Sequence, residues 1–109
     1  MAEVYGILAQ SAPSATTSTD IYTVPTGRYA VVSSVVVSNL TAASKTFRLS
    51  VARLAEALAN KQYLAYDMTL DANSTVTLQL GITMSAGDVL RGYISATTVA
   101  FNVFGSEIY

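Results

Sequence analysis

The chain has 109 residues, of which 51% are hydrophobic and only 12% are charged, and its formal net charge is −1 at pH 7. So apolar a composition excludes a disordered segment, which needs low hydrophobicity and a high net charge. The six basic residues are scattered and form no stripe that could neutralise phosphates, so neither nucleic acid nor an anionic membrane surface is expected as a partner.

The low charge also bears on the protein's surface, because a lone soluble domain normally carries many more charged residues. Part of the surface is therefore expected to be buried against other copies or other proteins. The alternative is a well-packed sandwich whose faces carry serine and threonine in place of charges.

Cysteine and histidine are both absent from the chain. Disulfides and thiolate metal sites are thereby excluded, and the commonest general base and metal ligand is missing. Met1–Val4 shows no basic leader followed by an apolar segment, so no signal peptide is expected. We expect a protein that is made in a cytoplasm and stays soluble until it assembles.

A strand is expected over residues 4–10, followed by residues 11–19, a stretch of small polar residues with one proline. This stretch is either a long loop or a flexible linker. In the second case residues 1–19 form a flexible N-terminal arm on a single domain that spans 1–109, and its strand could pair with a neighbouring subunit.

The central segment begins with a strand over 20–24 and a tight turn at Pro25-Thr26-Gly27. Residues 29–37 (YAVVSSVVV) are apolar at both odd and even positions, which predicts a strand covered on both faces. In the next strand Phe47, Leu49 and Val51 alternate with polar residues, as in a strand with one buried face.

The second half of the chain continues the pattern. Residues 54–60 (LAEALAN) favour a loop with one helical turn, because seven residues are too few for a stable helix. In all, about eight strands are expected, over 4–10, 20–24, 28–39, 45–53, 62–70, 75–80, 89–95 and 98–107. The pattern predicts an all-β fold, a single antiparallel β-sandwich that is jelly-roll-like.

Catalytic and metal-binding constellations are not found. The two lysines, Lys45 and Lys61, lie outside any Ser-x-x-Lys pattern, and no serine stands in a Gly-x-Ser-x-Gly turn. Asp67, Asp71 and Asn73 could supply oxygen ligands to calcium, but they lack the glycine and terminal glutamate of a dedicated loop. We interpret these carboxylates as turn caps and expect no enzyme, no metal and no cofactor.

Seven tyrosines and no tryptophan stand out in this composition. Tyrosine joins an apolar ring to a polar tip, which suits subunit interfaces and stacking on sugars as well as the rim of a strand. Strand parity places Tyr63 and Tyr66 on opposite faces. The interface candidates are Tyr22, Tyr29, Tyr63, Tyr66, Tyr93 and Tyr109.

The run from Ile21 to Asn39 (IYTVPTGRYAVVSSVVVSN) resembles a recurrent segment of small structural proteins of tailed bacteriophages, which reads YTVPxGxxAVVSSIVVxN. The resemblance extends to residues 46–51, 58–64, 88–93 and 101–105 and thus covers nearly all of the chain after the first ten residues. It implies a virion structural component with a β-sandwich fold. It assigns no functional residues.

From this resemblance we expect a capsid cement or decoration protein that acts as a homo-oligomer, in particular a trimer, with major capsid proteins as partners. The alternative is a tail, baseplate or tail-fibre component, an adaptor or a receptor-binding tip whose Tyr63, Tyr66 and 54–61 loop touch a host glycan. A third hypothesis, from a different class, is a small ligand-binding or enzymatic β-domain, which would require a concave pocket with convergent polar groups.

Overall fold

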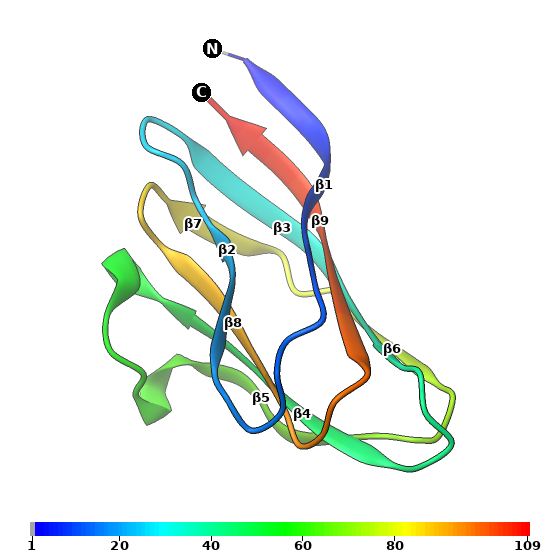
Figure 1. The fold of residues 1–109 in the computed structure, drawn as a ribbon. Coiled ribbons are helices and arrows are strands. Elements are labelled where there is room, and N and C mark those ends of the chain that lie inside the picture. Colours follow the sequence, from blue (N-terminus) through cyan, green and yellow to red (C-terminus); the bar gives the residue numbers. More distant parts are fainter. Residues whose placement is uncertain (1) are drawn as a thin grey trace.

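The computed structural model describes residues 2–109 and is built almost entirely from strands (Figure 1). Two short 3-10 turns, η1 (Arg53–Ala55) and η2 (Asn60–Gln62), interrupt the strand pattern, and no helix within the described residues is long and apolar enough to cross a membrane. The strands are β1 (Glu3–Ser11), β2 (Thr19–Thr23), β3 (Tyr29–Asn39), β4 (Lys45–Ala52), β5 (Tyr63–Leu70), β6 (Thr75–Leu78), β7 (Ile82–Ser85), β8 (Val89–Ile94) and β9 (Val99–Ile108).

The strands form two antiparallel sheets packed face to face. The first sheet has the order β1-β9-β3-β6, with β7 also paired to β3, and the second has the order β2-β8-β4-β5. β6 and β7 pair with successive halves of β3, so they act as one strand that is broken near Gly81, where φ is +60°. Counted in this way, the strand order is that of an eight-stranded jelly roll, in which every connection except the one from β4 to β5 crosses between two four-stranded sheets.

The predicted fold class, an all-β antiparallel sandwich, is thus confirmed. The strand predicted over residues 75–80 includes β6 and extends to the break at Gly81. β7 was not predicted, because Gly81 interrupts the alternation of apolar and polar residues there. The loop after β4 contains two helical turns where one was expected.

The core lies between the sheets and consists mainly of side chains from alternate strand positions. Its largest members include Phe47 of β4 and Phe101 of β9, whose rings meet edge to face with centroids 6.2 Å apart. The other large, fully buried residues are aliphatic: Leu49, Leu70, Leu90, Ile94, Val24, Val32, Val35, Val37, Val89 and Val99.

The central strand β3 differs from its prediction. Within this chain only one of its faces is covered, because the buried positions Ala30 and Val32 are followed, after a bulge near Ser33, by Val35 and Val37. The bulge changes the parity of the buried side, which places apolar residues at odd and even positions of a strand with one buried face.

The chain ends meet at one end of the first sheet (Figure 1). β1 is an edge strand that pairs with β9 of the same chain, and the Tyr109 amide donates to the Ala2 carbonyl at 2.9 Å. Most side chains of β1 remain exposed, and none belongs to the buried core. An exchange of residues 1–19 between subunits stays a prediction.

Candidate functional site

The outer face of the second sheet carries an aromatic and ionic cluster, here called the tyrosine–arginine face: Arg48, Tyr63, Tyr66, Asp67 and Tyr93. The Arg48 guanidinium lies between two rings, 4.2 Å from the centroid of Tyr66 and 4.3 Å from that of Tyr93. Its Nε donates to Asp67 Oδ1 at 2.6 Å, and this hydrogen bond raises the pKa of Arg48. These contacts hold Arg48, Tyr66, Tyr93 and Asp67 in a single arrangement.

Two irregularities in the pairing of β4 with β5 produce this cluster. Leu49 pairs with Ala65 while Phe47 pairs with Met68, so two residues of β5, Tyr66 and Asp67, stand opposite the single residue Arg48. Asp67 adopts a φ of +50°, which a bulge of this kind tolerates at some cost in backbone strain.

The same irregularities overturn the parity prediction for Tyr63 and Tyr66. The two rings contact each other edge to face, with centroids 4.8 Å apart, so they share the outer face. A second register shift, between Leu49 and Ser50, leaves Leu64 unpaired and cancels the alternation on which the prediction rested. Because Arg48 covers one ring face of Tyr66 and of Tyr93, less aromatic surface is open for stacking on a sugar.

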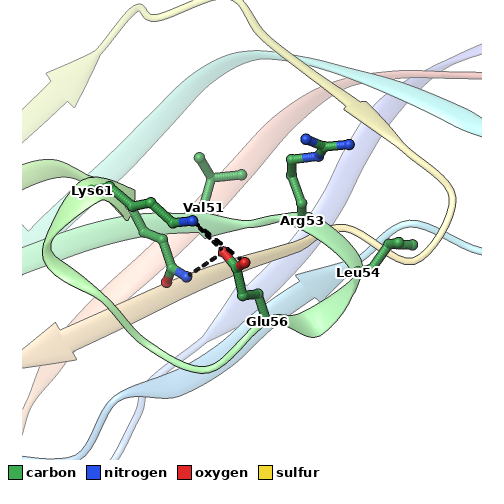
Figure 2. Close-up of a pocket in the computed structure, with 6 residues that line it drawn as sticks. Val51, Arg53, Leu54, Glu56 and Lys61 are labelled. Atoms are coloured by element: carbon green, nitrogen blue, oxygen red, sulfur yellow. Dashed lines mark hydrogen bonds and ion pairs between the residues drawn. The ribbon is translucent and has the colours of Figure 1, made fainter.

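The loop between β4 and β5 forms a pocket of about 540 Å³ at the end of the second sheet (Figure 2). Glu56 accepts from Lys61 and from the Gln62 amide, and these hydrogen bonds lower the pKa of the Glu56 carboxyl. Leu54 and Ala55 both have positive φ values, an unusual conformation for two consecutive residues that are not glycine.

The ionic groups of this pocket are largely engaged with one another, as the dashed lines in Figure 2 show. Gln62 is only 5% exposed, and its Nε2 donates to the Ala57 carbonyl at 2.8 Å while its Oε1 has no partner among the described residues. The side chain of the neighbouring Arg91 donates to the backbone carbonyl of Glu56 at 2.9 Å, and this hydrogen bond connects the loop to β8. No nucleophile next to a free base is found among the lining residues.

The outer face of the first sheet is of a different kind. Directly paired strand residues share a face, so its members follow from the register of the strands. Among these outward residues only Glu3 is charged, and we call this surface the neutral face. Its residues are Glu3, Tyr5, Ile7 and Gln10 of β1; Tyr29, Val31, Ser34, Val36 and Ser38 of β3; Thr75, Thr77, Thr83 and Ser85 of β6 and β7; and Ala100, Asn102, Phe104, Ser106 and Ile108 of β9.

One end of the neutral face is apolar and hollowed. A shallow groove of about 650 Å³ runs across β9 from β1 to β3, and its walls include Tyr5, Ile7, Val31 and Phe104, together with the charged Glu3. Tyr5 is 78% exposed and Ile7 is 60% exposed, although both are large apolar side chains. Within the described chain nothing covers them.

The six tyrosines predicted as interface candidates separate into four environments. Tyr63, Tyr66 and Tyr93 lie on the tyrosine–arginine face, Tyr29 lies exposed on the neutral face, and the Tyr109 ring stacks on Arg28, whose guanidinium carbon is 3.9 Å from the ring centroid. The sixth candidate, Tyr22, lies in the core, so the prediction that it is an interface residue is wrong.

Tyr22 is only 7% exposed because its ring belongs to the core between the sheets. Its hydroxyl donates to Glu107 at 2.5 Å, and Glu107 also accepts from Arg28 at 2.8 Å. Burial, together with this hydrogen bond, raises the pKa of Tyr22. Tyr22 therefore has a structural role and offers no surface to a neighbour.

The structure does not bring the candidate calcium ligands together as a site. Asp67 is bound to Arg48, and in residues 2–109 no group of three or more acidic side chains lies close enough to hold a metal ion. Asp71 and Asn73 belong to the turn after β5, in which the Asp71 carbonyl accepts from the Ser74 hydroxyl at 2.7 Å. Asp88 caps backbone amides, accepting from Ser85 at 2.9 Å and from Leu54 at 3.0 Å.

Sequence reasoning missed Arg48 and the neutral face. For Arg48 a signal existed, since it occupies an outward position between Phe47 and Leu49, but its contact with Tyr66 depends on the bulge. For the neutral face the low charge of the whole chain was visible, whereas its concentration on one sheet depends on which strands are neighbours.

The sequence matches no family model and no curated protein. Among solved structures, the chain is similar to two crystal structures described as a pentameric capsid protein isolated from metagenomic phage sequences. Both share 20% sequence identity with this chain at a TM-score of 0.30, and the alignments cover 95% of this chain. They cover 62% and 64% of the two capsid chains, so this chain spans less than two thirds of their length.

Proposed function

We propose that this chain is a structural protein of a tailed-phage particle and that it decorates the capsid as a homo-oligomer, across junctions between major capsid subunits. The proposal starts from the resemblance of Ile21–Asn39 to small structural proteins of tailed phages. The jelly roll is compatible with this role, since viral capsid domains use it, although the fold is shared with unrelated functions.

The observation that carries the proposal is the amount of large apolar surface left exposed on a small sandwich. Isolated exposed apolar residues are ordinary, but Tyr5 and Ile7 adjoin Val31 and Phe104 in one groove. Continuous surfaces of this kind in soluble proteins mark interfaces with other chains.

The ionisable side chains support a binding role over a catalytic one. Asp20, Glu56, Asp67 and Glu107 each lie in an ion pair with a basic side chain. In the pocket beside Glu56, the carboxylate is bonded to Lys61 and to the Gln62 Nε2. The buried Gln62 Oε1 has no partner among the described residues, but one acceptor does not make the convergent set of polar groups that the ligand-binding hypothesis requires.

The proposed mechanism is mass action. A protein that binds the assembled shell and not its separated subunits stabilises the shell by an amount that grows with the logarithm of its free concentration, once that concentration exceeds the dissociation constant. Particles that lack the protein are then expected to open at lower temperature or milder osmotic shock than particles that carry it.

A role in the tail is a second candidate, favoured by the tyrosine–arginine face beside the exposed 53–62 loop. Tyrosine and arginine side chains are enriched among the residues that dominate binding energy at protein interfaces. Retention of the protein on host glycans, lost in Tyr63→Ala and kept in Tyr29→Phe, would support a receptor-binding tip. No retention on any host glycan would remove that version.

The experiment that tests the proposal is cryo-electron microscopy of intact particles. Density for this sandwich on the shell lattice, together with reduced heat resistance of particles lacking it, is the expected result. Density confined to the tail would replace decoration by the second candidate. Absence of the protein from purified particles would overturn both.

A further inference from the structure

The charges of this protein are distributed unevenly between its two outer sheet faces. On the second sheet the outward residues include Arg48 with Asp67 and Arg91 with Asp20. On the neutral face of the first sheet the only charged side chain among the described residues is Glu3, at the end of β1. Interface centres are depleted in charge and enriched in tyrosine and phenylalanine, which is the composition of the neutral face.

The neutral character of this face restricts what can cover it. A charged partner surface would lose the hydration of its ions without finding counter-charges there, and that loss is costly. The same cost applies if the neutral face packs on the tyrosine–arginine face of another copy, because that contact would bury ion pairs against neutral groups. When the neutral face packs on itself, by contrast, the only charge that it brings to the contact is the Glu3 carboxylate of each copy, at the end of β1.

The size of the face agrees with such a contact. Four strands spaced about 4.8 Å apart and about ten residues long, at about 3.3 Å per residue, present roughly 600 Å² per copy. Two copies would therefore bury roughly 1,200 Å² in total, which is at the lower end of the range for specific protein–protein interfaces.

From these observations we propose that the neutral face is the interface between two copies of this chain, which pack it against the same face of a partner about a two-fold axis. Tyr5, Ile7 and Phe104 form the apolar part of the contact, and Ser38, Thr75 and Thr77 the small polar part. The inference rests on the homo-oligomer of the proposed function. It replaces the expected trimer, since a two-fold contact yields two copies or a multiple of two.

The test is the mass of the full-length protein in solution, measured by light scattering on an eluting column over a range of concentrations. Wild type is expected at the mass of two chains or a multiple of two. Ile7→Lys buries a charge in the contact and is expected to weaken association by about tenfold or more. Thr77→Lys, at an exposed position in the polar part, is expected to act in the same direction without disturbing an apolar cluster.

The matched control is Leu64→Lys, which places the same charge on an exposed residue of β5 in the second sheet. It is expected to leave the mass unchanged, and circular dichroism of all variants checks that each is folded. If only Leu64→Lys weakened association, or if neither neutral-face variant did, the assignment of the face would be wrong while the proposed function stood.

Two other results would also decide the question. A wild-type mass of three chains would overturn the two-fold contact and restore the trimer. A monomer at every concentration would overturn self-association through this face. The place of the protein in the phage particle would then depend on the cryo-electron microscopy alone.

Discussion

Tyr22 and Glu107 connect the two sheets through a part-buried hydrogen bond between their side chains. Tyr22 lies on β2 in the second sheet, Glu107 lies on β9 in the first, and their hydrogen bond is 2.5 Å long. Because burial and this bond raise the pKa of Tyr22 above its ordinary value of 10.0, the folded protein holds the phenolic proton more tightly than the unfolded chain does.

The linkage between this proton and folding gives a pH dependence. A pKa that is raised in the folded state contributes stability that is fully present below about pH 10, and it is lost as pH rises above that value, where the unfolded chain releases the proton first. We expect the free energy of unfolding, measured by urea titration between pH 8 and about pH 11, to fall with pH less steeply in Tyr22→Phe than in wild type. Equal slopes would contradict the assignment.

Gly105 and Gly6 are direct partners in the pairing of β9 with β1, yet their surroundings differ. A Cβ atom on Gly105 would overlap the Val31 carbonyl oxygen, whereas a Cβ atom on Gly6 would meet nothing within 4 Å. Gly105 is therefore required by the close approach of β3, and Gly6 is not.

We expect Gly105→Ala to lower the free energy of unfolding by about 1–3 kcal/mol, because the backbone of β3 has to move. Gly6→Ala serves as the matched control and is expected to change it by less than about 0.5 kcal/mol. Urea denaturation followed by circular dichroism measures both. Similar losses in the two variants would show that the close approach to Val31 is unimportant.

At the scale of elements, the end of β3 is held by Asn39, which is buried and fully bonded. Its Nδ2 donates to the carbonyls of Ala43, Leu70 and Asp71, and its Oδ1 accepts from the amide and hydroxyl of Thr41. One side chain thereby joins the loop after β3 to the end of β5, in the other sheet.

Replacing this residue is expected to loosen both connections. Asn39→Ala leaves buried carbonyls without donors and should lower the free energy of unfolding by about 2–3 kcal/mol. Asn102→Ala is the control, since Asn102 bonds only to the exposed Gln10 side chain at 2.8 Å, and a loss below about 0.5 kcal/mol is expected. Thermal and urea unfolding check both; equal losses would remove the special role of Asn39.

The elements also show where prediction from the sequence stops. Strand existence was predicted well wherever apolar residues alternate, as in β4 and β9, because a half-buried strand requires that pattern. Prediction failed at bulges: near Ser33 it suggested a strand covered on both faces, and in β5 it separated Tyr63 from Tyr66. A bulge depends on the partner strand, which the local sequence does not describe.

At the scale of the whole molecule, the proposed association between two copies has a consequence for stability. If copies associate only when folded, association stabilises the folded state by mass action, and the stabilisation grows with protein concentration. We expect the Tm of wild type to rise with concentration and the Tm of Ile7→Lys to depend on it much less. Differential scanning calorimetry at two concentrations measures this, and a Tm of wild type that does not change would argue against association.

By itself the sequence determined the fold class, the number of strands to within one, and the scarcity of charge and of catalytic side chains. All of these follow from composition and local periodicity, because a strand's own residues decide which of its sides is apolar. The position of Tyr22 in the core, the Arg48 cluster and the neutral face were decided only by the tertiary structure. Each depends on which strands become neighbours and on the register in which they pair, and the residues of a single strand do not determine either.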